Sequence, residues 1–452
     1  MAGKEKLESV RLTTLSVHYT INRKEVILIK KLFTVFLCTV LALCTTGCRN
    51  NDTIDTLLSA PSLTREQSSV LKALSAAHSG HTTFVFPATG SNRSAIRQLD
   101  IDNDGDEEAV AFFRDPDSGI NAHMAILEPD GHGNYYISSE LEGPGNGIAS
   151  FSLIRGNQSD SVLLVEWTSQ SISFNSFAAY IYKDEKLELG MEENCTDLTL
   201  SDIDQDGIQE FLYTTKASDD GFLLKAVKLS DDSLKTIASH RLVRSALGIK
   251  NILEGLLSDG TIALFVDEIT GTGLQTEVFV FNDGVINDAA FNRGYDIPSL
   301  TQRADSDYLT SRRHGDIMCI PSSVPPSADI QQQPNLMYWY TFREGNAVLD
   351  ETAFISTVYG ISMGIPDNWT SGCTLKAETE GTYTVTIFSS DNQELLTLVV
   401  LNVNDDAVPY TDSGFTLLGN TASNRFFCRF RCTEEETDYI KTHFSILRLG
   451  EY

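Results

Sequence analysis

The sequence predicts a mainly β protein in which one β unit is repeated, followed by a smaller α+β domain. Two nine-residue acidic segments begin at Asp100 and Asp202, and each runs into an apolar stretch of β-forming residues. Strand-like runs separated by turn residues recur about every 50 residues around these segments. The repeat then stops at a stretch rich in Pro, Ser and Gln, beyond which strands and helices are mixed.

The first 48 residues are typical of a targeting segment. Two lysines precede the apolar run Leu32–Leu43, which is too short to span a bilayer and suits the core of a signal peptide. Small residues then lead to Cys48, in a pattern that resembles a bacterial lipobox, where the cysteine is lipidated. Residues 1–29 carry mixed charge and indicate an over-extended start. We therefore expect an extracytoplasmic lipoprotein attached to the cell membrane; the alternative is a single uncleaved membrane anchor.

Residues 49–81 are expected to form a tether with one short helix. The first part is polar, and the segment Arg65–Ala77 places Val70, Leu71 and Leu74 at helical spacing. From about Thr82 onward the period becomes that of strands.

The two acidic segments have the composition of loops that bind a hard divalent cation. Each carries carboxylates at positions 1, 3, 5 and 9 and a glycine at position 6, and Ca²⁺ prefers several oxygen ligands around such a turn. The expected side-chain ligands are Asp100, Asp102, Asp104 and Glu108 in the first loop and Asp202, Asp204, Asp206 and Glu210 in the second. Asp106 and Ile208 are expected to supply backbone carbonyls. The alternative is a pair of solvated acidic turns that bind nothing.

These loops are not EF-hands, because position 12 is Ala111 in one and Tyr213 in the other, and a strand rather than a helix follows. A nine-residue loop that runs straight into a strand resembles the calcium loop of FG-GAP/VCBS repeats, the blades of integrin-α-like β-propellers. The resemblance rests on these two segments. It implies a propeller-like array, structural Ca²⁺, and a role in adhesion or in binding proteins or polysaccharides.

Three further segments keep the turn and the strand but lack the carboxylates. They lie at Ile154–Asp160, Leu257–Gly260 and Arg313–Asp316. Residues 82–322 thus hold about five repeats, fewer than the seven blades of integrin heads, so an open or atypical array is the alternative to a closed ring.

Residues 323–336 are predicted to be a linker, and residues 337–452 a separate α+β domain. In that domain we expect a short helix around Thr352–Tyr359, three strands between residues 373 and 403, and a helix at Glu434–Lys441.

The chain is strongly acidic, with 62 Asp and Glu against 34 Lys and Arg and a net charge of −28. Such a charge repels nucleic acid, so nucleic acid is excluded as a partner. After Cys48 five cysteines remain, namely Cys195, Cys319, Cys373, Cys428 and Cys432. They are too few and too far apart for a disulfide scaffold, and we expect buried thiols or one facultative disulfide.

No segment matches a nucleophile elbow, a zinc-protease helix or a phosphate-binding loop. Trp167 is expected to be a packed strand residue rather than a sugar-stacking platform. We therefore expect no enzyme, but a binding, adhesion or envelope-accessory protein of a Gram-positive-type bacterium. The alternative is a Ca²⁺-dependent hydrolase or lyase that acts on envelope polysaccharide.

Overall fold

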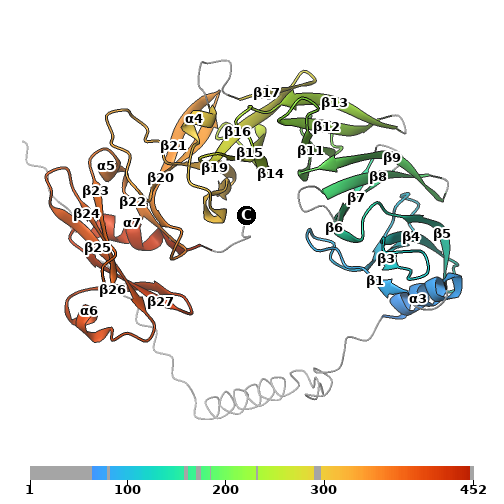
Figure 1. Cartoon of the computed structure of the whole chain (residues 1–452), viewed down its shortest axis with the longest axis horizontal. Coiled ribbons are helices and arrows are strands. Elements are labelled where there is room, and N and C mark those ends of the chain that lie inside the picture. Colours follow the sequence, from blue (N-terminus) through green and yellow to red (C-terminus); the bar gives the residue numbers. More distant parts are fainter. Residues whose placement is uncertain are drawn as a thin grey trace, which may run out of the picture. The chain divides into compact units, whose positions relative to one another are not determined.

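The computed structural model describes residues 64–78, 82–156, 161–168, 175–183, 185–230, 233–289 and 297–447 (Figure 1). The described residues from Arg65 onward form one compact body. The predicted signal region and its lipidation site Cys48 lie outside the described residues. Within the described part, no helix combines the length and the apolar character needed to cross a membrane.

The body is mainly β, as predicted. Its described strands form five sheets, which we divide into β-modules 1 to 6 because one ten-stranded sheet contains both module 4 and module 5 (Figure 1). β-modules 1 and 2 comprise β2 (Ile96–Leu99), β3 (Glu108–Arg114), β4 (His123–Pro129) and β5 (Tyr135–Glu142), then β6 (Gly147–Arg155), β7 (Ser161–Thr168), β8 (Asn175–Lys183) and β9 (Lys186–Cys195). β-modules 3 and 4 comprise β10 (Asp197–Ser201), β11 (Glu210–Lys216), β12 (Phe222–Ser230) and β13 (Ser233–Arg241), then β14 (Gly248–Leu256), β15 (Ile262–Thr270), β16 (Gly273–Asn282) and β17 (Val285–Asp288). In these four modules each strand pairs with the next one in sequence, and β1 (Thr83–Phe84) adds to β3.

The last two modules lie beyond residue 311. β-module 5 comprises β18 (Arg312–His314), β19 (Ile317–Ser322), β20 (Leu336–Arg343), β21 (Asn346–Ser356) and β22 (Ile361–Ile365), with β28 (Phe444–Ile446) at its edge. β-module 6 comprises β23 (Thr374–Glu378), β24 (Tyr383–Phe388), β25 (Glu394–Asn402), β26 (Thr416–Asn420) and β27 (Asn424–Phe430). One parallel pair, Leu256 with Ile317, joins modules 4 and 5, and none of the described sheets closes on itself.

Helices make up little of the described chain. α3 (Arg65–Ala77) has the predicted bounds and buries Val70 and Leu74 against β-module 1. The others are α4 (Ile297–Leu300), the 3₁₀ turn η2 (Asp307–Leu309), α5 (Asp367–Thr370), α6 (Val408–Asp412) and α7 (Glu434–Thr442). α7 was also predicted, and Thr433 and Glu436 form a capping box at its N-terminus.

Successive modules pack face to face, and the larger clusters of buried residues are each shared by two modules that are neighbours in the chain. In β7, Leu163 and Val165 face module 1, whereas Val162 and Leu164 face module 3. The strand is therefore apolar at consecutive positions, because alternate side chains of a strand point to opposite faces and both faces are covered. The fully buried Trp167 belongs to the first of these clusters, so its prediction as a packed strand residue is confirmed.

The acidic loops occupy the same place in two modules, between the first and the second strand. The first loop connects β2 to β3, and the second connects β10 to β11. The turns predicted to be degenerate copies connect β6 to β7, β14 to β15 and β18 to β19, although residues 157–160 of the first lie outside the described part. The second strands begin at Glu108, Ser161, Glu210, Ile262 and Ile317.

The predicted linker at 323–336 does not separate two domains. β19 ends at Ser322 and β20 begins at Leu336, and these two strands pair in one sheet, with Ile320 opposite Tyr340. The boundary fails because composition reveals a loop but not the pairing of the strands on either side. The helix expected around Thr352–Tyr359 is also wrong, since β21 runs to Ser356 between β20 and β22.

All five cysteines of the body are thiols in the described chain. Cys195, Cys319, Cys373 and Cys428 are buried, and burial raises the pKa of each. A buried, protonated thiol is a poor nucleophile and a poor metal ligand.

Candidate functional sites: two acidic loops and a pocket

The two acidic loops follow the same backbone path. Asn103 and Gln205, at position 4, have φ of 61° and 58°, and Gly105 and Gly207, at position 6, have φ of 99° and 91°. Glycine suits position 6 because φ in this range strains any residue with a Cβ. The two loops therefore share two left-handed positions in the same order.

The glutamate at position 9 of each loop is buried and accepts a hydrogen bond from the backbone of position 2. Glu108 is 1% exposed and Glu210 is 0% exposed, because each begins the second strand of its module. The Glu108 carboxylate accepts the backbone N–H of Ile101 at 2.6 Å, and the Glu210 carboxylate accepts that of Ile203 at 3.0 Å.

In the first loop, oxygens of Asp100, Asp102 and Glu108 lie within 4.8 Å of one another. Oδ1 of Asp100 is buried without a hydrogen-bond partner in the described chain. Burial raises the pKa of Glu108 to about 7, and the neighbouring carboxylates of Glu128 and Asp102 add to the rise. A cluster that combines the buried carboxyl group of Glu108 with an unsatisfied oxygen of Asp100 fits a hard divalent cation. Asp104 and Asp106 lie on the exposed side, where Asp104 accepts the N–H of Asp106 at 2.8 Å.

In the second loop, oxygens of Asp202, Asp204 and Asp206 lie within 4.8 Å of one another, and Asp206 accepts the N–H of Ile208. This loop also contains an ammonium group that the sequence did not predict. Nζ of Lys228 lies 2.5 Å from Asp204 Oδ2, 2.7 Å from Asp206 Oδ2 and 3.0 Å from Glu210 Oε1. Burial lowers the pKa of Lys228, but the three carboxylates outweigh burial and raise this pKa above its ordinary value.

Lys228 belongs to β12, about 20 residues beyond the loop, and no local motif links the two. Its only sequence signal is its place in the following strand, where β11 pairs with β12 and Phe211 lies opposite Val227. The neighbouring pair in this register is Glu210 and Lys228. Finding the lysine from sequence requires the strand register, which loop spacing does not contain.

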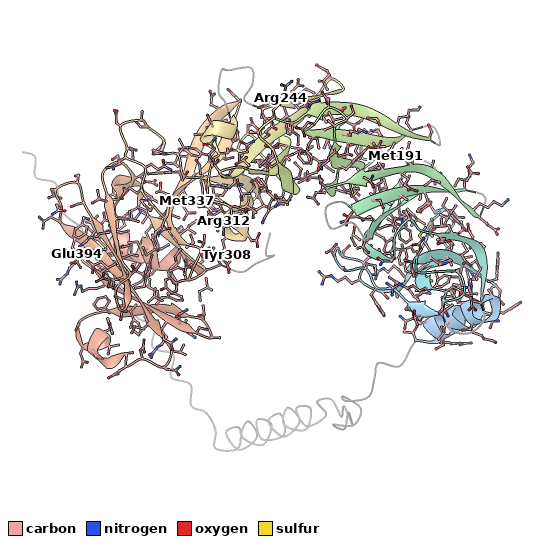
Figure 2. All side chains as sticks on the ribbon, in the orientation of Figure 1. Met191, Arg244, Tyr308, Arg312, Met337 and Glu394 are labelled. Atoms are coloured by element: carbon pink, nitrogen blue, oxygen red, sulfur yellow. The ribbon has the colours of Figure 1, made fainter. Side chains whose placement is uncertain are left out.

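A pocket of about 610 Å³ is lined by the turn between β15 and β16, the segment around residues 302–309, the loop between β19 and β20, and residues of β20 and β21. Its buried apolar lining residues include Leu309, Ile355 and Met337. Of these three, Figure 2 labels Met337. The polar side chains at its lining are Thr272, Gln302, Arg303, Ser323, Gln332, Gln333, Asn335 and Thr357. Among the described residues of the lining there is no Asp, Glu, His or Cys. Arg303 contributes no net charge, because its guanidinium forms a fully buried ion pair with Asp267 at 2.9 Å.

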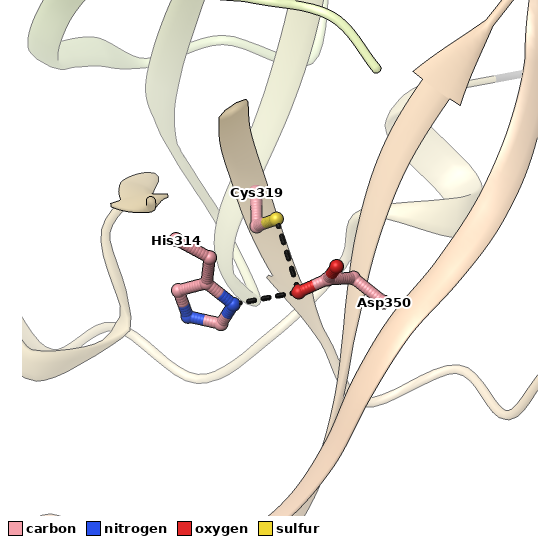
Figure 3. A group of neighbouring side chains, drawn as sticks. All are labelled: His314, Cys319 and Asp350. Carbon is pink, nitrogen blue, oxygen red and sulfur yellow. Dashed lines mark hydrogen bonds and ion pairs between the residues drawn. The ribbon is translucent and has the colours of Figure 1, made fainter. Parts of the chain in front are cut away.

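A second polar cluster lies on β18, β19 and β21. His314 Nδ1 donates to Asp350 Oδ2 at 2.7 Å, and the Cys319 thiol donates to the same oxygen at 3.5 Å (Figure 3). Asp350 reaches this position because it is the extra residue of a β-bulge between the pairs Trp339–Glu351 and Tyr340–Leu349.

This cluster is a satisfied hydrogen-bond network rather than a metal site. Arg312 Nε donates to His314 Nε2 at 3.0 Å, and arginine only donates, so the ring proton is on Nδ1. A metal on Nδ1 would move that proton to Nε2, where it would face the Arg312 N–H. The Arg312 guanidinium is held in place by stacking 3.8 Å from the Trp339 ring.

Another pair of carboxyl groups, Glu268 and Glu277, lies inside module 4. They are 0% and 3% exposed, so no substrate reaches them. Burial raises the pKa of Glu268 far above its ordinary value, and the adjacent Glu277 carboxylate adds to the rise.

No family model and no curated protein matches the chain. Among solved structures, the chain is similar to the rhamnogalacturonan lyase YesW, at 14% identity and a TM-score of 0.29 over 67% of this chain and 60% of that one. It is similar to the exotype rhamnogalacturonan lyase YesX, at 12% identity and a TM-score of 0.30 over 76% and 63%. It is also similar to TolB from Acinetobacter baumannii, at 14% identity and a TM-score of 0.22 over 63% and 61%. The chain spans less than two thirds of the length of each of these proteins. At such TM-scores the likenesses carry no argument about fold or activity.

Proposed function

We propose that the protein is an extracytoplasmic lipoprotein, attached to the membrane through Cys48, whose β-modules form a propeller-like binding array stabilised by Ca²⁺. The observation that carries this proposal is the recurrence of one loop, with the same backbone path, at the same place in two modules. Each copy gathers three carboxylates within 4.8 Å. The face-to-face packing of successive modules supports the propeller-like arrangement.

The role proposed for Ca²⁺ is structural. The loop connects the first two strands of a module, and its ninth residue is buried at the start of the second strand. Without a cation, the buried Glu108 carboxylate lies beside Asp100 and Asp102 with no opposite charge, which costs free energy in the folded state. A bound cation offsets that cost, so binding and folding are coupled.

Removal of Ca²⁺ is therefore expected to lower the melting temperature. Calcium present at about 100 times its Kd contributes about 2.7 kcal/mol, so chelation lowers the melting temperature of a body of this size by about 3 °C. Differential scanning calorimetry with EDTA, and then with excess Ca²⁺, measures the loss and its recovery. NaCl at matched ionic strength is the control, because it screens charge without coordinating the loop. An unchanged melting temperature, together with no calorimetric Ca²⁺ binding, contradicts the proposal.

The composition of the pocket lining supports a binding function rather than catalytic turnover. Hydrolysis or elimination needs a positioned acid or base, and the described part of the pocket lining offers no carboxyl, imidazole or thiol group. Its amides and hydroxyls over an apolar floor suit the recognition of an uncharged, hydrogen-bonding part of a polysaccharide or protein. The closed Glu268–Glu277 pair supports the same conclusion, because a glycosidase needs two carboxyl groups that reach the substrate.

A glycan array and polysaccharide degradation assays on cell-wall and host polysaccharides test this part of the proposal. We expect retention of a glycan or envelope ligand without release of products. The variant Gln332→Ala, in the pocket lining, should weaken retention about tenfold, whereas its exposed neighbour Gln331→Ala should not. Turnover of a polysaccharide by the wild type would instead establish the Ca²⁺-dependent hydrolase or lyase alternative.

A further inference from the structure

The two acidic loops differ in the charge of the residue that lies opposite position 9 on the adjacent strand. In module 1, Ala109 pairs with Leu127, so the neighbouring position places Glu128 opposite Glu108. In module 3, Phe211 pairs with Val227, so the same position places Lys228 opposite Glu210. The loops are alike in sequence and backbone, and the residue opposite position 9 reverses its charge between them.

Lys228 gives the second loop a cation of its own. The ammonium contacts one oxygen each of Asp204, Asp206 and Glu210 within 3.0 Å, and the lysine side chain is only 13% exposed. These are three of the four side chains predicted to hold a metal. A divalent cation that entered this loop would have to displace the ammonium and leave it beside a second positive charge.

Glu128 supplies a further acidic group to the first loop, where Lys228 supplies a cation to the second. Its Oε1 accepts the hydroxyl groups of Tyr182 and Ser138, which hold the side chain at the loop. It is a fifth acidic side chain at this loop, beside the four predicted side-chain ligands. In the described part of the chain, no lysine or arginine forms an ion pair with any of these five carboxylates, and Oδ1 of Asp100 is buried and unpartnered.

We propose that only the first loop binds Ca²⁺, with Glu128 as an added carboxylate facing the ion, and that Lys228 is a built-in cation that holds the second loop closed without metal. This inference rests on the proposed Ca²⁺-stabilised array. It assigns the metal dependence to module 1 and makes module 3 independent of calcium.

The number of Ca²⁺ ions bound per chain tests the proposal. Isothermal titration of the full chain, freed of metal with EDTA and then dialysed, should give one site in the wild type. Asp102→Asn should abolish that site, and Asp204→Asn should leave it intact. The reverse pattern overturns the proposal.

Lys228 variants give the sharper result. Lys228→Met removes the ammonium and should raise the number of sites from one to two, whereas Lys228→Arg keeps the charge and should stay at one. The matched control is Lys225→Met, on the same strand, because Lys225 pairs with Glu193 at 2.8 Å instead of with the loop. A single site in a folded Lys228→Met variant overturns the proposal.

The variant Glu128→Lys places a lysine opposite Glu108, as Lys228 lies opposite Glu210, and leaves the second loop unchanged. This variant should bind no Ca²⁺ and should melt at the same temperature with and without EDTA. Retention of a wild-type site in Glu128→Lys, or two equivalent sites in the wild type, overturns this inference alone. Absence of any binding and of any EDTA effect in the wild type overturns the proposed function as well.

Discussion

At the scale of single residues, buried charges make this protein sensitive to its ionic surroundings. Glu268 accepts a hydrogen bond from Gln275 at 2.6 Å and lies beside Glu277, and burial with this second carboxylate raises the pKa of Glu268. Because its pKa in the folded state exceeds the unfolded value near 4.5, the fold favours the protonated form. The contribution is complete below about pH 4.5 and is lost as the pH rises towards the folded pKa.

The free energy of unfolding is therefore expected to fall between pH 5 and 9, by up to about 1.4 kcal/mol per pH unit. The variant Glu268→Gln keeps the shape and a donor towards Glu277, so it should flatten this dependence and be more stable than the wild type at pH 9. Urea denaturation at pH 5, 7 and 9 measures the slope. The exposed Glu380→Gln is the control, and an equal slope in both variants contradicts the prediction.

At Gly207 the backbone conformation, and not side-chain packing, restricts which residue can be accommodated. Its φ is 91°, and a Cβ built there meets nothing within 4 Å. The variant Gly207→Ala should therefore lose about 1 kcal/mol from strain alone. Gly271→Ala, in an equally open turn without a left-handed φ, is the control and should be neutral or slightly stabilising in thermal melts. Equal effects at both positions would show that φ does not matter here.

At the scale of elements, helical periodicity in the sequence predicted the position of α3, and the tertiary structure shows which of its residues pack against the sheet. Helical spacing marked Val70, Leu71 and Leu74, but only Val70 and Leu74 are fully buried, against β3 and β4. The helix is thus part of the folded body and not of the tether. Burial of an apolar stripe on a sheet stabilises so short a helix more than its own propensity does.

Leu74→Ala should accordingly destabilise the body by about 2–5 kcal/mol, because a fully buried leucine leaves a cavity under α3. The exposed Lys72→Ala, on the same helix, should change the free energy of unfolding by less than about 0.5 kcal/mol. Denaturant titration of both variants compares them. A small effect of Leu74→Ala would mean that α3 is dispensable to the body.

At the scale of the whole molecule, stability depends on the order in which modules cover one another. Tyr338, Tyr340 and Phe354 of module 5 are buried by residues of module 6, including Leu398 and Phe426. A chain truncated after residue 370 should therefore expose this apolar face and bind a hydrophobic dye or aggregate. A chain that ends at residue 447 keeps module 6 and is the control for dye fluorescence and light scattering. A soluble truncated chain that binds no dye contradicts this account.

Local sequence determined the features that depend on a few consecutive residues. The carboxylates at alternate positions and the glycine at position 6 predicted where the two loops lie and that a strand follows each. The bounds of α3 followed from apolar spacing. These features are local because turn geometry, strand alternation and helical period are encoded within about ten residues.

Only the tertiary structure decided which charges meet. It joined β19 to β20 across the predicted linker and placed Lys228 in one loop and Glu128 beside the other. Strand register sets these contacts, and a slip of one residue would turn either side chain to the opposite face of its sheet. The sequence by itself therefore determined two similar loops, whereas the pairing of the next strand made them electrostatically opposite.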